Sequence, residues 1–286
     1  MSNLLVLAAG MSSRMKKEMS GSDTESALYL QANSLPKGMI GVGKGGRPFL
    51  DYQLYNAAKG GFKQVGLVLN EKDTVTKPYY ETQMANNATW GLEIQFLIQK
   101  IPTDRIKPLG TADAVQQGLE QLPQWAGQKF TACNSDNLYS AQVFKLMANN
   151  PHPAGLISYD AEGLGFDHEK VKNCAILYED ENDFLENLIE KPSDNELIEC
   201  KNRNGRLGIS MNIFNMGYEQ GLTYMRNQPL NTTRNEKEMP EAVNRIAKDY
   251  KGTVKAFHVF EIMPDLTEKA DLNIVKSYLE KEFTEL

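Results

Sequence analysis

The sequence of 286 residues is poor in cysteine, with three, and in histidine, also with three. Cys133, Cys174 and Cys200 are widely spaced, form no CxxC pair and make no plausible set of zinc ligands with the histidines. We therefore expect reduced thiols with a structural role.

The sequence also lacks the features of a membrane or secreted protein. No apolar run approaches the roughly 20 residues that a helix needs to cross a bilayer. The short apolar run at residues 4–7 has no basic segment before it, as a secretory signal would require. There are no repeats and no linker rich in proline or serine. We therefore expect a cytoplasmic protein without a membrane partner, forming a single domain over residues 1–286.

A basic excess is missing as well, since the formal net charge is −6. This balance argues against a nucleic-acid partner, but a few well-placed lysines and arginines would suffice to bind a nucleotide. The hydrophobic content of 41% and the charged content of 24% are typical of a soluble globular protein.

Short apolar runs alternate with helical patterns through the first half of the chain. This alternation predicts βαβ units around a mainly parallel sheet, a doubly wound α/β fold of the Rossmann-like kind. The second half has β-like segments broken by acidic and Gly/Asn turns. The stretch from Lys16 to Ser34 has little pattern, which indicates a mobile inserted loop. The expected strands are residues 4–7, 65–69, 94–99, 130–134, 154–159, 174–178, 184–190, 209–214 and 254–260. The expected helices are residues 50–59, 111–121, 141–148, 236–248 and 267–281.

The opening segment predicts a phosphate-binding turn. The buried strand at residues 4–7 runs directly into small residues, which let backbone N–H groups approach an anion closely. Arg14 adds a planar donor fork suited to phosphate oxygens, although ordinary βα units can also begin this way. The residues of this turn are Ala8, Ala9, Gly10 and Met11.

Two further features lie between this turn and residue 50. Lys37 follows Pro36 and offers a point charge for a second phosphate. Residues 41–46 match the letters GxGxxG, but no clear strand precedes them and Pro48 interrupts the helix opening that a dinucleotide site needs. We interpret them as a turn that leads into the next helix.

Residues 99–111 are suited to hold a base. Gln99 ends a predicted strand, and its amide can both donate to and accept from a base edge. Gly110 would let a flat ring lie against the backbone, and Thr111 is a candidate N-cap. An ordinary capped helix start would look the same.

Three charged residues follow later in the chain. Asp136 comes directly after a predicted central strand, where ligands bind in open α/β sheets and where a carboxylate suits Mg²⁺. Lys191 precedes Pro192, which predicts an extended conformation that aims its ammonium group. Asp265 precedes the last helix and could supply a second carboxylate or simply cap that helix.

Taken in order, the segments LAAGMSSRM, LPK, PLGTADAV, NSD, EKP and DLTEKADL resemble motifs of the sugar-1-phosphate nucleotidylyltransferases. The resemblance runs from residue 3 to about residue 272. It implies the mixed, doubly wound sheet of the nucleotide-diphospho-sugar transferases, with a nucleotide half at 1–150 and an acceptor half at 151–286. No C-terminal β-helix is expected.

The resemblance also implies roles for individual residues. Arg14 and Lys37 would hold the triphosphate, Gln99 and Gly110 the base, and Lys191 the phosphate of a small-molecule acceptor. Asp136 and Asp265 would bind Mg²⁺. The sequence departs from the pattern at Ser12 and Thr267, where the family usually has glycine.

Two other functions compete with a transferase of nucleotidyl groups. A glycosyltransferase of related fold would use a DxD-like motif, and residue 134 is asparagine rather than aspartate. A non-catalytic sensor of sugar nucleotides would not need Lys191 and both aspartates. The sequence identifies neither the base nor the acceptor, which could be a sugar, polyol or amino-alcohol phosphate.

Overall fold

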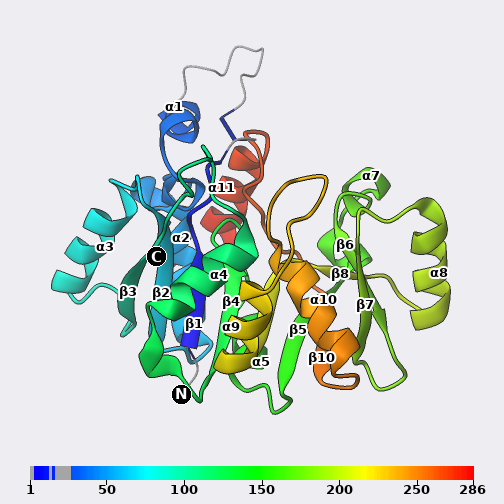
Figure 1. The fold of residues 1–286 in the computed structure, drawn as a ribbon. Helices are drawn as coiled ribbons and strands as arrows, with labels where there is room; N and C mark the ends of the chain where they lie inside the picture. The colour runs from blue at the N-terminus through cyan, green and yellow to red at the C-terminus, as the bar shows by residue number, and fades with distance from the viewer. Residues whose placement is uncertain (1–2, 13–14, 17–26) are drawn as a thin grey trace.

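The computed structural model describes residues 3–12, 15–16 and 27–286. Ten strands form one mixed sheet across both halves of the chain, flanked by helices (Figure 1). The strands are β1 (Asn3–Leu7), β2 (Gln64–Asn70), β3 (Glu93–Gln99), β4 (Lys129–Asn134), β5 (Ala154–Asp160), β6 (Ala175–Glu179), β7 (Leu185–Glu190), β8 (Gly208–Ser210), β9 (Ile213–Gly217) and β10 (Val254–Val259). The α-helices are α1 (Ala27–Ser34), α2 (Phe49–Lys59), α3 (Thr76–Ala85), α4 (Thr111–Glu120), α5 (Ala141–Ala148), α6 (Ala161–Leu164), α7 (His168–Val171), α8 (Asp194–Asn204), α9 (Tyr218–Arg226), α10 (Met239–Asp249) and α11 (Asp271–Glu282).

The first four strands form the parallel part of the sheet. β1 lies between β2 and β4, and β2 pairs with β3, all in parallel. Leu4 and Val6 point into one core and Leu5 and Leu7 into the other, because successive side chains of a strand face opposite sides. Helices α2, α3 and α5 pack on the first face, and α4, α9 and α10 on the second. The predicted doubly wound α/β fold is confirmed.

Beyond β4 the sheet becomes mostly antiparallel, and it is therefore the mixed sheet that the resemblance implies. β9 pairs antiparallel with β4 and β5, whereas β8 pairs with β5 and β6. The single strand expected at 209–214 is therefore wrong. It is broken at residues 211–212, where Asn212 has a φ of 57°. Before this break β8 pairs with β6, and after it β9 pairs with β4. The strands β4 and β6 therefore separate at the break.

Several expected boundaries and loops also need correction. The last eight residues of the predicted loop at 16–34 form α1, whose Ala32 is buried in a third core cluster with α2 and α11. The helices expected at 236–248 and 267–281 begin later, at Met239 and Asp271. Helices α3, α6, α7, α8 and α9 are missing from the prediction. The turn expected at 41–46 is confirmed, since it leads into α2 at Phe49.

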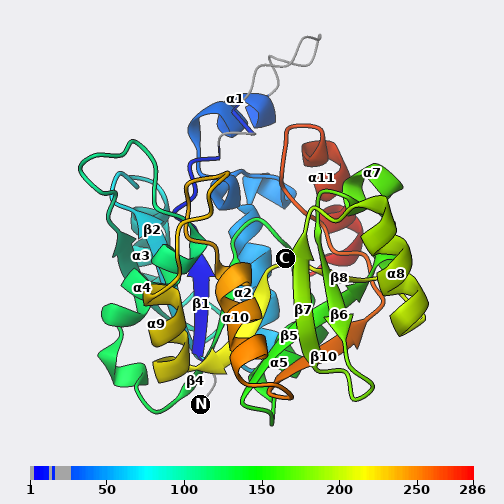
Figure 2. The same cartoon turned by 45° about the vertical axis from the view of Figure 1, so that its right-hand side comes forward.

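The carboxyl ends of β1, β2, β3 and β4 lie at the same edge of the sheet because these strands are parallel. Figure 2 shows β1 pointing toward this edge, where the long connection before α10 also lies. Ligands of open α/β sheets bind at such edges. The candidate site is therefore sought there.

Candidate active site

A first cavity, with a volume of about 330 Å³, lies at the carboxyl ends of the parallel strands. It brings together nearly all the residues that the sequence predicts for nucleotide binding. Arg14 is the exception, because it lies outside the described residues. The predicted residues that line the cavity are Ala8, Ala9, Gly10, Met11, Lys37, Gln99, Gly110, Thr111 and Asp136.

The turn after β1 is held by the neighbouring strand and has a strained residue. The N–H of Ala8 donates to the carbonyl oxygen of Val68 at 2.9 Å, and a Cβ placed on Gly10 would meet no atom within 4 Å. Ser12 has a φ of 56°. Glycine adopts such a conformation at no steric cost, whereas serine does not. The departure from the family pattern at Ser12 therefore strains the turn.

Gly110 has a steric reason to be glycine. Its φ is 118°, and a Cβ there would lie 2.3 Å from the carbonyl oxygen of Lys237. Gly110 is also the N-cap of α4, so the N-cap role predicted for Thr111 is wrong. The hydroxyl of Thr111 instead accepts a hydrogen bond from the N–H of Met239 at 2.9 Å. This bond joins the starts of α4 and α10.

Lys37 and Asp136 form an ion pair in the lining of the first cavity. The ammonium group of Lys37 lies 2.8 Å from Oδ2 of Asp136, and their side chains are only 11% and 24% exposed. Two different segments, the short helix that begins at Lys37 and the end of β4, thus place opposite charges together. A phosphate group arriving here would meet a cation that is already oriented.

Asp265 lies beside Asp136, although the two are far apart in the sequence. The N–H of Leu266 donates to the carbonyl oxygen of Asp136 at 2.8 Å, and Asn137 forms a β-bridge with Asp265. Burial raises the pKa of Asp265 to about 6, and the nearby charge of Asp136 adds to this shift. A bound cation would offset the burial and the mutual repulsion of these two carboxylates. The pair is therefore suited to bind one.

Thr267 supports Asp265 directly. Its hydroxyl donates to Oδ2 of Asp265 at 2.6 Å, and Asn137 donates to Oδ1 at 3.3 Å. Asp265 does not cap the last helix, because α11 begins six residues later at Asp271. The threonine that replaces the usual glycine therefore orients the carboxylate.

A second cavity, of about 920 Å³, adjoins the first. It lies where β4 and β6 separate, and it is lined by Asp265 and Lys191 and by residues of the break at 211–212. Asn134 and Asp136 line both cavities. The two cavities therefore meet at the end of β4.

Lys191 lines the second cavity, but its predicted extended conformation is wrong. Its φ is 50°, in the left-handed region that a non-glycine residue rarely adopts. The N–H of Lys191 donates to the carbonyl oxygen of Cys174 at 3.1 Å, which continues the pairing of β6 with β7 past the last strand residue. The chain then turns sharply toward Ser193, the N-cap of α8. Strained residues of this kind cluster at functional sites.

Comparison with protein families shows to which family the chain belongs. A family model described as nucleotidyl transferase matches residues 29–262. The chain belongs to the nucleotidyl transferase family. A search among curated proteins found no match.

Membership makes the protein a nucleotidyltransferase, and the family generally uses a divalent metal. The match includes Lys37, Gln99, Asp136 and Lys191 but neither the opening turn nor Asp265. No helix in the described part of the chain is long and apolar enough to span a membrane.

The nucleotidyl transferase has site residues that the sequence did not suggest. Arg234 lines the second cavity, 3.2 Å from a carboxylate oxygen of Glu190 and 2.9 Å from one of Glu238. Burial, followed by the charge of Glu190, raises the pKa of Glu238 to about 7. Arg234 lies in a stretch with no periodic pattern, and its partner Glu190 is 44 positions away. No local signal could have identified it.

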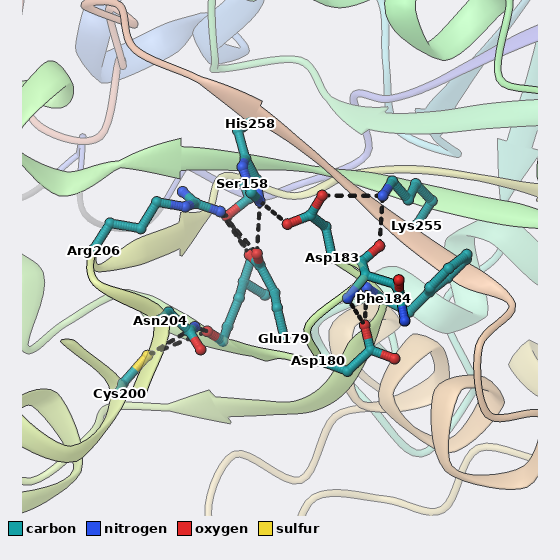
Figure 3. Close-up of polar contacts among 12 residues, drawn as sticks. Ser158, Glu179, Asp180, Asp183, Phe184, Cys200, Asn204, Arg206, Lys255 and His258 are labelled. Atoms are coloured by element: carbon teal, nitrogen blue, oxygen red, sulfur yellow. Dashed lines mark hydrogen bonds and ion pairs between the residues drawn. The ribbon is translucent and has the colours of Figure 1, made fainter. Parts of the chain in front are cut away.

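A second polar cluster lies away from both cavities, between β6 and β10. Glu179, Asp183 and His258 bring three potential metal-ligand atoms within 4.8 Å of one another. Figure 3 shows Glu179 between Arg206 and His258, with Lys255 on Asp183. Although burial opposes it, bonds from His258 and Ser158 and the charge of Arg206 hold the pKa of Glu179 below its usual value. Because two cations already balance these carboxylates, we interpret the cluster as structural.

Proposed function

We propose that the protein transfers a nucleotidyl group from a nucleoside triphosphate to a sugar 1-phosphate or a similar phosphorylated acceptor. The observation that carries this proposal is the meeting of two cavities at Asp136, one suited to a nucleotide and the other to an acceptor. An oxygen of the acceptor phosphate attacks the α-phosphorus and forms a new P–O bond. The bond from the α-phosphorus to the oxygen that bridges to the β-phosphorus breaks, and pyrophosphate leaves with the electron pair.

No general base is needed for this step, because a phosphate monoester is already largely ionised at neutral pH. Catalysis then depends on positioning and on neutralising charge. In this proposal Lys37 and Arg14 bind the triphosphate, and the turn residues 8–11 approach it through their N–H groups. Lys191 binds the acceptor phosphate from the second cavity.

The donor set of the site fits Mg²⁺. Asp136 and Asp265 offer carboxylate oxygens, the ligands that Mg²⁺ prefers, and phosphate oxygens and water can complete its shell. The raised pKa of Asp265 supports this fit, since a cation would favour the ionised form of both acids. When bound, Mg²⁺ would neutralise charge on the phosphoryl oxygens.

The proposal is tested by a screen of nucleoside triphosphates against phosphorylated acceptors, with pyrophosphate release as the readout. The acceptors should include sugar 1-phosphates, a polyol phosphate and an amino-alcohol phosphate. We expect release that requires an acceptor together with Mg²⁺. Turnover of a nucleotide sugar without pyrophosphate release would instead identify a glycosyltransferase, and nucleotide binding without any turnover would identify a sensor.

A further inference from the structure

The first cavity contains a buried glutamine, Gln99, whose amide oxygen has no hydrogen-bond partner among the residues that the structure describes. Nε2 of Gln99 donates to Oδ2 of Asp113 at 2.7 Å and to the carbonyl oxygen of Gly110 at 3.1 Å. A glutamine amide has two N–H donors and one carbonyl acceptor. Because both donors are used within the protein, Gln99 can offer a ligand only the acceptor oxygen Oε1.

A chain of hydrogen bonds that begins at the backbone fixes this orientation. The N–H of Lys100 donates to Oε1 of Gln117 at 2.9 Å, and Nε2 of Gln117 donates to Oδ2 of Asp113 at 2.8 Å. Since a backbone N–H can only donate, the Gln117 amide cannot turn over without losing its bond to Lys100. The carboxylate of Asp113, which is 6% exposed, therefore receives N–H groups from both glutamines.

Turning the Gln99 amide by 180° would be costly. Its oxygen would then face two acceptors, the carboxylate of Asp113 and the carbonyl of Gly110, and both hydrogen bonds would be lost. Gln99 is only 2% exposed, so water cannot readily replace these bonds. The carbonyl of Gly110 is fixed in place, because the next turn of backbone is tied to Lys237 by the bond from the Ala112 N–H at 3.0 Å.

We propose that Asp113 is a positioning residue that makes the base subsite select a ring N–H. This inference rests on the proposed function and on the contact of Gln99 with the base that the family resemblance implies. Uracil, thymine and guanine carry a protonated ring nitrogen on the edge that Oε1 would meet. Cytosine and adenine carry a lone pair at the corresponding nitrogen, so acceptor would face acceptor if the ring lay in the same place. Only a displaced ring could donate to Oε1 from its exocyclic amino group. Sites built to bond one polar group strongly reject analogues that lack it.

Equilibrium binding of nucleotides tests the inference separately from catalysis. UTP, dTTP, GTP, CTP and ATP are titrated calorimetrically into the wild-type protein with Mg²⁺ and without an acceptor. We expect at least one of the first three to bind about 10²-fold more tightly than CTP and ATP. The comparison among UTP, dTTP and GTP then distinguishes a pyrimidine imide from guanine.

Variants at Asp113 test the positioning role. Asp113→Leu removes the acceptor that holds Gln99, and we expect the preference to fall to about tenfold or less. Asp113→Asn keeps an acceptor oxygen and should retain the preference. If the role of Asp113 were merely structural, Asp113→Leu would instead weaken the binding of all five nucleotides to the same extent. Gln116→Leu is the matched control, because Gln116 lies on the same helix and its side chain donates to Glu120 rather than to Asp113. If Asp113→Leu does not fold, Gln117→Leu loosens the same chain and should also reduce the preference.

Three outcomes of these titrations would contradict the inference, the role of Asp113 or the proposed function. Equal or tighter binding of CTP or ATP to the wild-type protein would overturn the inference and leave the proposed function standing. An unchanged preference in the folded Asp113→Leu or Gln117→Leu variant would overturn the positioning role of Asp113 and leave the proposed function standing. Failure of the wild-type protein to bind any nucleotide would contradict the proposed function, and the inference would be lost with it.

Discussion

Replacing Asp265 by asparagine should stabilise the protein in the absence of metal while it removes activity. Asp265 is held beside Asp136, and its pKa is raised from 3.8 to about 6 by burial and by that neighbour. An acid whose pKa is raised on folding destabilises the native state when it ionises. The wild-type protein should therefore lose stability as the pH rises from about 4 through about 6, and the variant should not.

The magnitude follows from the shift. Each pKa unit corresponds to about 1.4 kcal/mol, so a shift of about two units gives on the order of 3 kcal/mol at pH 7.5. Part of this gain is offset, because Thr267 and Asn137 donate to different oxygens of Asp265, and an asparagine keeps only one of the two acceptors. A net gain of about 2 kcal/mol should raise the melting temperature by roughly 3 °C for a chain of this length.

The assay is thermal and urea unfolding between pH 4 and 8 in buffer with EDTA, repeated with Mg²⁺. Glu268→Gln, an exposed neighbour, should change stability by less than about 0.5 kcal/mol. Mg²⁺ should stabilise the wild-type protein more than the Asp265→Asn variant, whose turnover should fall at least about 10²-fold. A variant that is less stable than the wild-type protein at pH 7.5 in EDTA would refute the reasoning.

Three further variants probe other parts of the structure. Lys191→Ala should weaken binding of the acceptor more than that of the nucleotide in calorimetric titrations, and equal losses would remove its assigned role. Ser12→Gly should raise the free energy of unfolding by about 0.5–1 kcal/mol, because the residue has a positive φ; an unchanged midpoint in urea would exclude strain there. Arg206→Met should cost about 3 kcal/mol at pH 7, since it leaves Glu179 without its cation. In the wild-type protein the contribution of Glu179 is lost only as the pH falls below about 4.5, because its pKa is lowered. In the variant the pKa of the uncompensated Glu179 should rise, so its deficit in stability relative to the wild-type protein should shrink as the pH falls from 7 toward about 4.5. A deficit that does not change with pH would contradict the ion-pair account.

The parallel half of the fold could be predicted because its strands are buried on both faces. Such strands are continuous apolar runs, so β1 and β4 are visible as residues 4–7 and 130–134. Helices α3 and α8 escape prediction for the opposite reason. Each buries only two side chains, Thr76 and Tyr80 in α3 and Leu197 and Cys200 in α8, which leaves little periodic signal.

The antiparallel half was harder to predict, because its course depends on contacts between distant segments. Residues 209–214 are predicted as one strand, but the chain breaks at residues 211–212. Before the break β8 pairs with β6, and after it β9 pairs with β4. The conformation of Lys191 likewise depends on its bond to Cys174 across the hairpin. Neither feature has a local sequence signal.

The candidate site was largely predictable where its residues end or directly follow buried strands, as Gln99 does at the end of β3 and Asp136 two residues after β4. The proximity of Asp136 and Asp265 could be expected only from the resemblance of the ordered motifs to the family, because 128 residues separate the two in the sequence. The partners of these residues were not predictable. Asp113 appears in the sequence only as one polar residue of an amphipathic helix, and its bond to Gln99 requires the folded helix and strand.

The fate of a labelled phosphorus atom tests the central claim most directly. The protein is incubated with Mg²⁺, a phosphorylated acceptor identified by the screen, and a nucleoside triphosphate labelled at its α- or γ-phosphorus. The account predicts that the α-label enters the acceptor product and that the γ-label leaves as pyrophosphate, in equal amounts. The Lys37→Met variant should lose at least about 10²-fold of this activity. Release of the α-label as free nucleotide, or of the γ-label as single phosphate, would contradict nucleotidyl transfer.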